Sequence, residues 1–157
     1  MSFRNVEYIP ILGLKPSEMA ALQELPGQDK DNILPLIPLK KWANSATLEK
    51  SFKRIEKAFG QRPILLDLDK EYLSACTEGN GGVVAEFLEL CNSAEGYKNW
   101  VNLFEQYPNY IPVLQIKDVD ELNTQLDSFI GLKRSLVLRL ELGIKVDKKL
   151  DINYFID

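Results

Sequence analysis

Eight polar side chains lie within or directly after short apolar runs of this sequence, and they are its candidates for a ligand-binding site. Among them are the carboxylates that Mg²⁺ prefers as ligands and the cations that bind phosphate. The set comprises Lys15, Lys40, Asp67, Asp69, Gln115, Lys117, Arg139 and Glu141.

These residues allow two interpretations. In the first, Asp67, Asp69 and Glu141 hold Mg²⁺ while the lysines and Arg139 bind a phosphate. In the second, the opposite charges pair with one another inside the fold and bind no ligand, because buried charges survive only when they are paired. We favour the internal ion-pair network and expect no resident metal.

Histidine is absent from the chain. This excludes a Ser-His or Cys-His nucleophile, a His-ligated zinc site and a His-ligated haem. The two cysteines, Cys76 and Cys91, form no CxxC motif, and we interpret both as reduced thiols. Neither the cysteines nor any histidine of this chain therefore offers a catalytic nucleophile or base.

Composition indicates a single globular domain of residues 1–157. Hydrophobic residues make up 45% and charged residues 27%, and no apolar run approaches the ~20 residues of a membrane span. With a net charge of -4 and scattered basic residues, we do not expect nucleic acid as a partner. The first residues show no secretory signal, so we expect a cytoplasmic protein.

Short apolar runs alternate along the chain with stretches of helical periodicity. This alternation favours an α/β fold with a parallel sheet. The predicted strands are 8–14, 33–39, 63–68, 110–116 and 135–142, and the predicted helices cover 16–25, 48–59, 83–90, 97–104 and 122–130. Residues 143–157 form a polar C-terminal tail with an apolar end at 152–156.

Two of the predicted strands repeat a pattern, because residues 8–15 and 110–117 share Tyr, Ile, Pro, Leu and a final Lys. The spacing between equivalent strand positions is 25, 28, 49 and 25 residues, near the ~30 residues of one unit of a (βα)₈ barrel. Five units fit this length. We therefore expect a TIM-barrel-like but incomplete set of βα units: a fragment, a half completed by a partner, or an open doubly wound sheet.

The opening of the chain, with Tyr8-Ile-Pro-Ile-Leu12, Ser17-Glu-Met-Ala-Ala-Leu22 and Ile33-Leu-Pro-Leu-Ile37, resembles the phage-type beta protein family. The resemblance covers residues 6–142 and implies a TIM-barrel-like fold in a chain about twice as long. Such chains occur in phages, prophages and bacterial genomes. The resemblance supplies no catalytic residues.

We therefore expect a phage or prophage protein that acts as a protein-interaction or accessory module. The alternative is a metal-assisted phosphodiesterase or phosphohydrolase that uses Mg²⁺ at Asp67, Asp69 and Glu141. Five strands leave two open sheet edges, and these favour a homodimer or another protein partner. The apolar end of the tail could cover an edge of a partner or pack on its own sheet.

Overall fold

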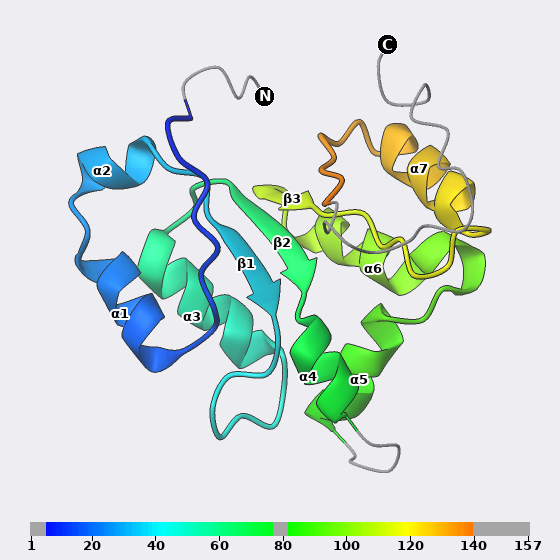
Figure 1. The fold of residues 1–157 in the computed structure, drawn as a ribbon, viewed down its shortest axis with the longest axis horizontal. Coiled ribbons are helices and arrows are strands. Elements are labelled where there is room, and N and C mark those ends of the chain that lie inside the picture. The colour runs from blue at the N-terminus through cyan, green and yellow to red at the C-terminus, as the bar shows by residue number, and fades with distance from the viewer. Residues whose placement is uncertain (1–5, 77–81, 140–157) are drawn as a thin grey trace.

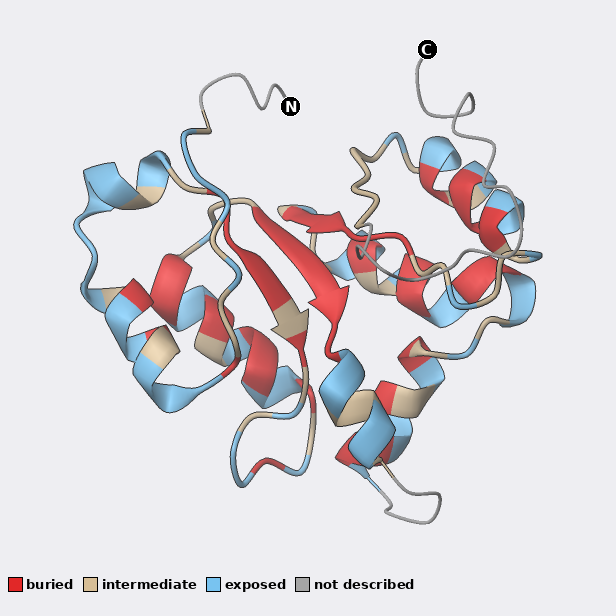
Figure 2. Cartoon of the chain, viewed as in Figure 1, coloured by how far each residue is buried: buried red, intermediate tan, exposed pale blue. Residues whose placement is uncertain are grey.

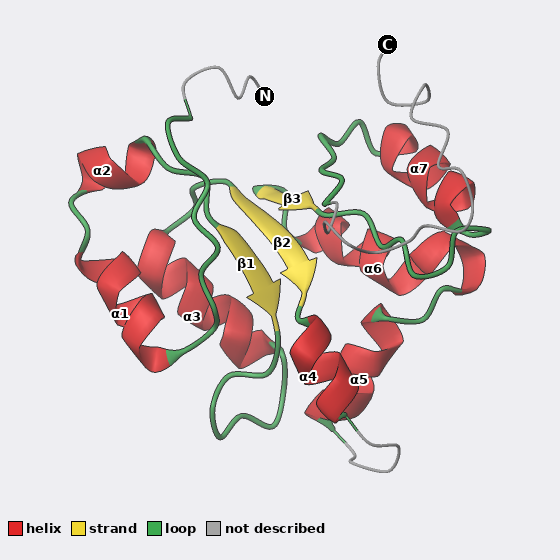
Figure 3. Ribbon diagram, viewed as in Figure 1, coloured by secondary structure: helices red, strands yellow, loops and turns green. Residues whose placement is uncertain are grey.

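A computed structural model describes residues 6–76 and 82–139 of the 157-residue chain. Helices lie before, between and after the short strands in these ranges (Figures 1 and 3). In chain order they are α1 (Pro16–Glu24), α2 (Gly27–Asp31), β1 (Leu36–Leu39), α3 (Glu49–Phe59), β2 (Ile64–Leu68), α4 (Lys70–Ala75), α5 (Val83–Leu90), α6 (Ala94–Gln106), β3 (Tyr110–Pro112) and α7 (Leu122–Gly131). No helix in the described ranges is long and apolar enough to cross a membrane.

The sheet is parallel, and its strands follow the chain order β1-β2-β3. Leu36 pairs with Leu65, and Leu65 pairs with Ile111. Residues before β1 and after β3 extend this order through single parallel bridges, Tyr8 with Ile33, Ile11 with Leu36, and Val113 with Val137. The prediction of an α/β fold with a parallel sheet is therefore confirmed.

The predicted five strands and the barrel-like closure are not found in the described residues, which form an open sheet of three strands. The segments 8–14 and 135–139 make isolated bridges instead of strands. One reason is local chemistry, since Pro10 has no N–H and the Gly13 amide donates to the Glu18 carboxylate. Each segment also has a partner on one side only. Residues 140–142 of the predicted fifth strand and the tail 143–157 lie outside the described residues.

Every helix that contributes buried side chains packs on one face of the sheet. There, Ile37, Leu39, Ile64, Leu66 and Leu68 meet the apolar sides of the helices. The centre of this core holds the largest fully buried side chains, among them Trp100, Tyr97, Phe59, Phe87, Phe104 and Phe129. Figure 2 shows this burial concentrated along the strands and on the sides of the helices that face them.

The opposite face of the sheet carries a second apolar group, here called the inner cluster, which contains no helical residue. Alternation along each strand selects its members, since neighbouring side chains point to opposite faces. Val6 and Val137 pack against it, half buried. The inner cluster consists of Leu34, Leu36, Leu65, Ile111 and Val113.

A left-handed turn at the start of α6 packs against the start of α7. Glu95, Gly96 and Tyr97 have φ values of 53°, 67° and 59°. The Gly96 amide donates to the Glu121 carboxylate at 2.8 Å, and a Cβ on Gly96 would lie 2.6 Å from the Gln125 backbone nitrogen. Only glycine fits this position, both for its φ and for its close contact with α7.

Substituting Gly96→Ala is expected to lower the free energy of unfolding by roughly 2 kcal/mol or more, because Ala disfavours this φ and clashes with α7. Denaturant unfolding measures the change. The matched control is Gly131→Ala, where an added Cβ meets nothing within 4 Å. Equal stability of the two variants would contradict this account of the turn.

Candidate functional site

The carboxyl end of the sheet carries a group of polar side chains on the same face as the inner cluster, here called the polar layer. Asp67 lies in β2, and Lys40 and Asp69 directly follow β1 and β2. Pro38 pairs with Asp67, and Val113 pairs with Val137. Paired residues of parallel strands point to the same face, and so do residues two positions further along each segment. Lys40, Asp69, Gln115 and Arg139 therefore lie on the same face as Asp67. The polar layer consists of Lys40, Asp67, Asp69, Gln115 and Arg139.

Asp67 is the most deeply buried charge of the polar layer, with 3% of its surface exposed. Its Oδ2 accepts a hydrogen bond from Arg139 Nη1 at 2.8 Å. Its Oδ1 accepts from the Leu68 amide at 2.8 Å and from Gln115 Nε2 at 3.5 Å. Both carboxylate oxygens are therefore bonded within the chain, as a buried charge requires.

Asp69 links the sheet to α4. Its Oδ1 accepts from the Tyr72 amide at 2.9 Å as the N-cap of α4, and its Oδ2 accepts from Lys40 Nζ at 2.7 Å. Burial by itself would raise the pKa of Asp69. The hydrogen bonds from Lys40 and the Tyr72 amide outweigh burial, so the pKa lies below its usual range.

The other predicted site residues are not part of this layer. Lys15 is exposed and lies 3.8 Å from Glu18 on α1. Lys117 is exposed and lines a separate pocket. Glu141 lies outside the described residues. The structure thus bonds five of the eight predicted side chains in two groups, Lys40 with Asp69, and Asp67 with Gln115 and Arg139. In the described ranges no three metal-ligating side chains form a cluster.

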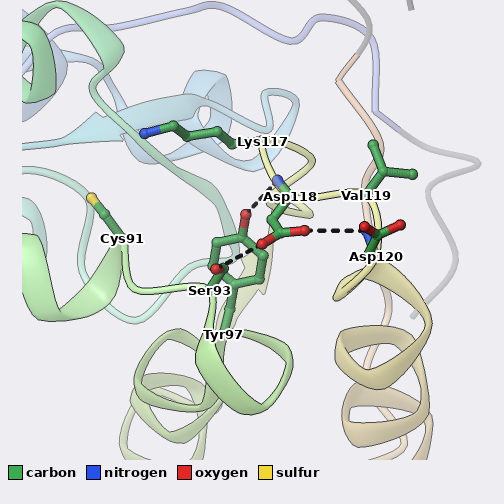
Figure 4. Close-up of a pocket in the computed structure, with 7 residues that line it drawn as sticks. All are labelled: Cys91, Ser93, Tyr97, Lys117, Asp118, Val119 and Asp120. Carbon is green, nitrogen blue, oxygen red and sulfur yellow. Dashed lines mark hydrogen bonds between the residues drawn. The ribbon is translucent and has the colours of Figure 1, made fainter. Parts of the chain in front are cut away.

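The separate pocket lies beyond β3, between the starts of α6 and α7 (Figure 4). It has a volume of about 430 Å³. Asp118 Oδ2 accepts from Ser93 Oγ at 3.0 Å, and the Asp118 amide donates to the Tyr97 hydroxyl at 2.9 Å. Lys117 extends away from this bonded group (Figure 4). Sequence reasoning identified Lys117 but missed its neighbour Asp118, although both directly follow an apolar run.

Cys91 also lines this pocket. Burial raises the pKa of its thiol to about 12, so the thiol is protonated at neutral pH. A protonated, half-buried thiol is a poor nucleophile. The pocket therefore offers polar contacts to a small molecule but no activated group.

The polar layer can pair charges internally, and its geometry matches the ion-pair interpretation of the sequence. For Asp67 or Asp69 to bind a metal ion, the ion would have to displace Arg139 or Lys40 from the carboxylate. The bond to Lys40 and the bond to Arg139 each connect segments far apart in the chain. The layer therefore holds the carboxyl ends of β1, β2 and the last described segment together.

The family model described as "Beta protein" matches residues 8–148. The chain is similar to Protein beta of Enterobacteria phage P4, with 30% identity over 152 residues that cover 94% of this chain and 41% of that protein. The chain thus spans about two fifths of the length of this relative. No solved structure matches the chain.

Because Asp69 caps α4 and pairs with Lys40, Asp69→Ala is expected to lower the free energy of unfolding at pH 7 by about 1–2 kcal/mol. A carboxyl whose pKa is lowered on folding stabilises the protein above its unfolded pKa, and this stabilisation is lost as pH falls through the folded pKa. The difference between wild type and variant should therefore shrink below about pH 4 in urea unfolding. Glu49→Ala, which removes an exposed pair with Lys53, is the control and should lower the free energy of unfolding by much less, because exposed ion pairs contribute little. A difference that persists at low pH would contradict the assignment.

Since both oxygens of Asp67 are bonded inside the chain, Mg²⁺ or Mn²⁺ is expected to leave the melting temperature of the protein unchanged. Thermal melting with and without each ion, for wild type and Asp67→Asn, measures this. A rise in wild type that disappears in Asp67→Asn would support the metal-dependent alternative instead.

Proposed function

The chain belongs to the Beta protein family, and we propose that it is a phage-type interaction module that binds a second copy of itself along an open edge of its sheet. The observation that carries this proposal is an exposed apolar segment at the start of the sheet. This segment, residues 6–12, is here called the first edge.

Three large apolar side chains of the first edge are exposed, Tyr8 by 64%, Ile9 by 51% and Ile11 by 60%. Ile11 pairs with Leu36, so Ile9 and Ile11 lie on the same face as the inner cluster. The central members of that face are nearly fully buried. The apolar surface therefore continues to the edge of the sheet and stops there uncovered, which is typical of an interaction site.

The backbone of the first edge is open on the same side. Tyr8 and Pro10 accept hydrogen bonds from Leu34 and Leu36, and Leu12 donates to Leu36. These even-numbered residues face β1, so the N–H and C=O groups of Ile9 and Ile11 face outward. Within the described residues those groups have no hydrogen-bond partner. An unpaired edge of this kind binds another strand readily.

A second copy of the chain is the partner that we propose. Two-fold association of identical chains is the commonest way in which soluble proteins cover such surfaces. The apolar end of the tail, which could also cover an edge, lies outside the described residues. The metal-assisted hydrolase receives less support, because Asp67 and Asp69 are bonded to cations of the chain itself.

Wild type is expected to sediment as a dimer at micromolar concentration, and Ile11→Lys as a monomer, because a charge on an edge strand opposes pairing. Sedimentation velocity measures both. The control is Ile130→Lys on α7, which changes an isoleucine of similar exposure, 61%, away from the edge, and which should remain dimeric. A monomeric wild type throughout the micromolar range would refute the proposal.

A further inference from the structure

We infer that the two copies pair their first edges antiparallel about a two-fold axis at Pro10, so that Ile9 of each copy bonds to Ile11 of the other. This inference rests on the proposed function and specifies its geometry. The open backbone groups of the first edge and the symmetry of two identical chains select this register.

The open stretch of the first edge is short, because the backbone on either side of it is already bonded. On one side, the Glu7 amide donates to a carbonyl of the connection between α2 and β1 at 3.1 Å. On the other side, the Gly13 amide and carbonyl are both bonded to residues at the start of α1. Among residues 7–13, only Ile9 and Ile11 therefore offer both of their backbone groups to a partner strand.

Two-fold symmetry requires this contact to be antiparallel. In a parallel pair, residues that lie level do not bond to each other. Leu36, for example, bonds to Pro10 and Leu12, whereas Ile11 lies level with Leu36 and faces away from it. A two-fold axis along the strands would set each Ile11 level with Ile11 of the other copy in a parallel pair, where their groups do not match. A two-fold axis perpendicular to the sheet makes the edges antiparallel, and outward residues that lie level then bond to each other.

Three antiparallel registers set Ile9 or Ile11 of one copy against Ile9 or Ile11 of the other. If Ile9 lies opposite Ile9, Ile11 meets Glu7, whose amide is already bonded. If Ile11 lies opposite Ile11, Ile9 meets Gly13, whose amide and carbonyl are both bonded. If Ile9 lies opposite Ile11, each of the two pairs exchanges both of its N–H···O bonds. Only this third register, centred on Pro10, satisfies all the outward groups.

The same register matches the side chains. The axis keeps the face of the inner cluster on the same side in both copies, so Ile9 lies directly beside Ile11 of the other copy. Tyr8 lies on the opposite face, because it pairs with a residue that packs on the helical core, and it meets Leu12 of the other copy. Pro10 does not interrupt the contact, since its missing N–H would face β1. The register therefore covers every exposed apolar side chain of the first edge.

Cysteine cross-linking tests the register. Ile9→Cys and Ile11→Cys are made in the full chain and oxidised with glutathione disulfide, separately and as an equal mixture. Only the mixture should give a disulfide-linked dimer on a non-reducing gel, because residue 9 lies opposite residue 11. Two copies of residue 9, or of residue 11, are displaced by about 7 Å along the strands in addition to the spacing between the strands, which is too far for a disulfide.

A second pair of variants tests the axis on the other face. Pro10→Cys should cross-link by itself, because the axis brings its two α-carbons within about 4.5 Å. Tyr8→Cys lies on the same face and is the matched control, which should not cross-link by itself. Peptide mapping identifies the linked residues, so that any link through Cys76 or Cys91 is recognised. Circular dichroism confirms that each variant is folded.

A cross-link in Ile9→Cys alone, or in Ile11→Cys alone, would show another register and overturn the inference. Variants that sediment as dimers under reducing conditions but form none of the expected cross-links would also overturn it, and would leave the proposed function intact. A monomeric wild type would refute both. If the isoleucine variants are monomeric, the comparison of Pro10→Cys with Tyr8→Cys decides.

Discussion

The parallel register that places Leu36 beside Leu65 and Leu65 beside Ile111 is the constraint on which the rest of the molecule depends. In a strand, alternate side chains point to opposite faces, so one register assigns every residue of the sheet to a face. One set of side chains meets the helices, and the other forms the inner cluster and the polar layer. A slip by one residue would place Asp67 among the phenylalanines of the helical core.

The polar layer follows from this register and from the cost of burying charge. The bonds from Arg139 and the Leu68 amide compensate the buried carboxylate of Asp67. Asp69 serves two purposes, since one oxygen caps α4 and the other holds Lys40. The charged residues at the strand ends thus connect elements that are distant in sequence. Their bonds explain their burial without a ligand.

The first edge of the sheet carries apolar side chains that the described residues do not cover. The central side chains of the inner cluster are covered, but Ile9 and Ile11 at the first edge are not. The phage P4 relative is more than twice as long as the region that matches. The described residues themselves form an open sheet of three strands without barrel closure.

The sequence by itself determined the α/β fold class and the parallel direction of the sheet. Both follow from local periodicity, and alternation along the strands named Lys40, Asp67, Asp69, Gln115 and Arg139 among eight candidates for one face. Other features arise only from contacts between distant segments. The sequence does not show that Lys40 bonds to Asp69, that Gly96 must pass close to α7, or that the outer segments stop at single bridges. Each depends on which groups the folded chain brings within bonding distance, and local periodicity contains no information about those distances.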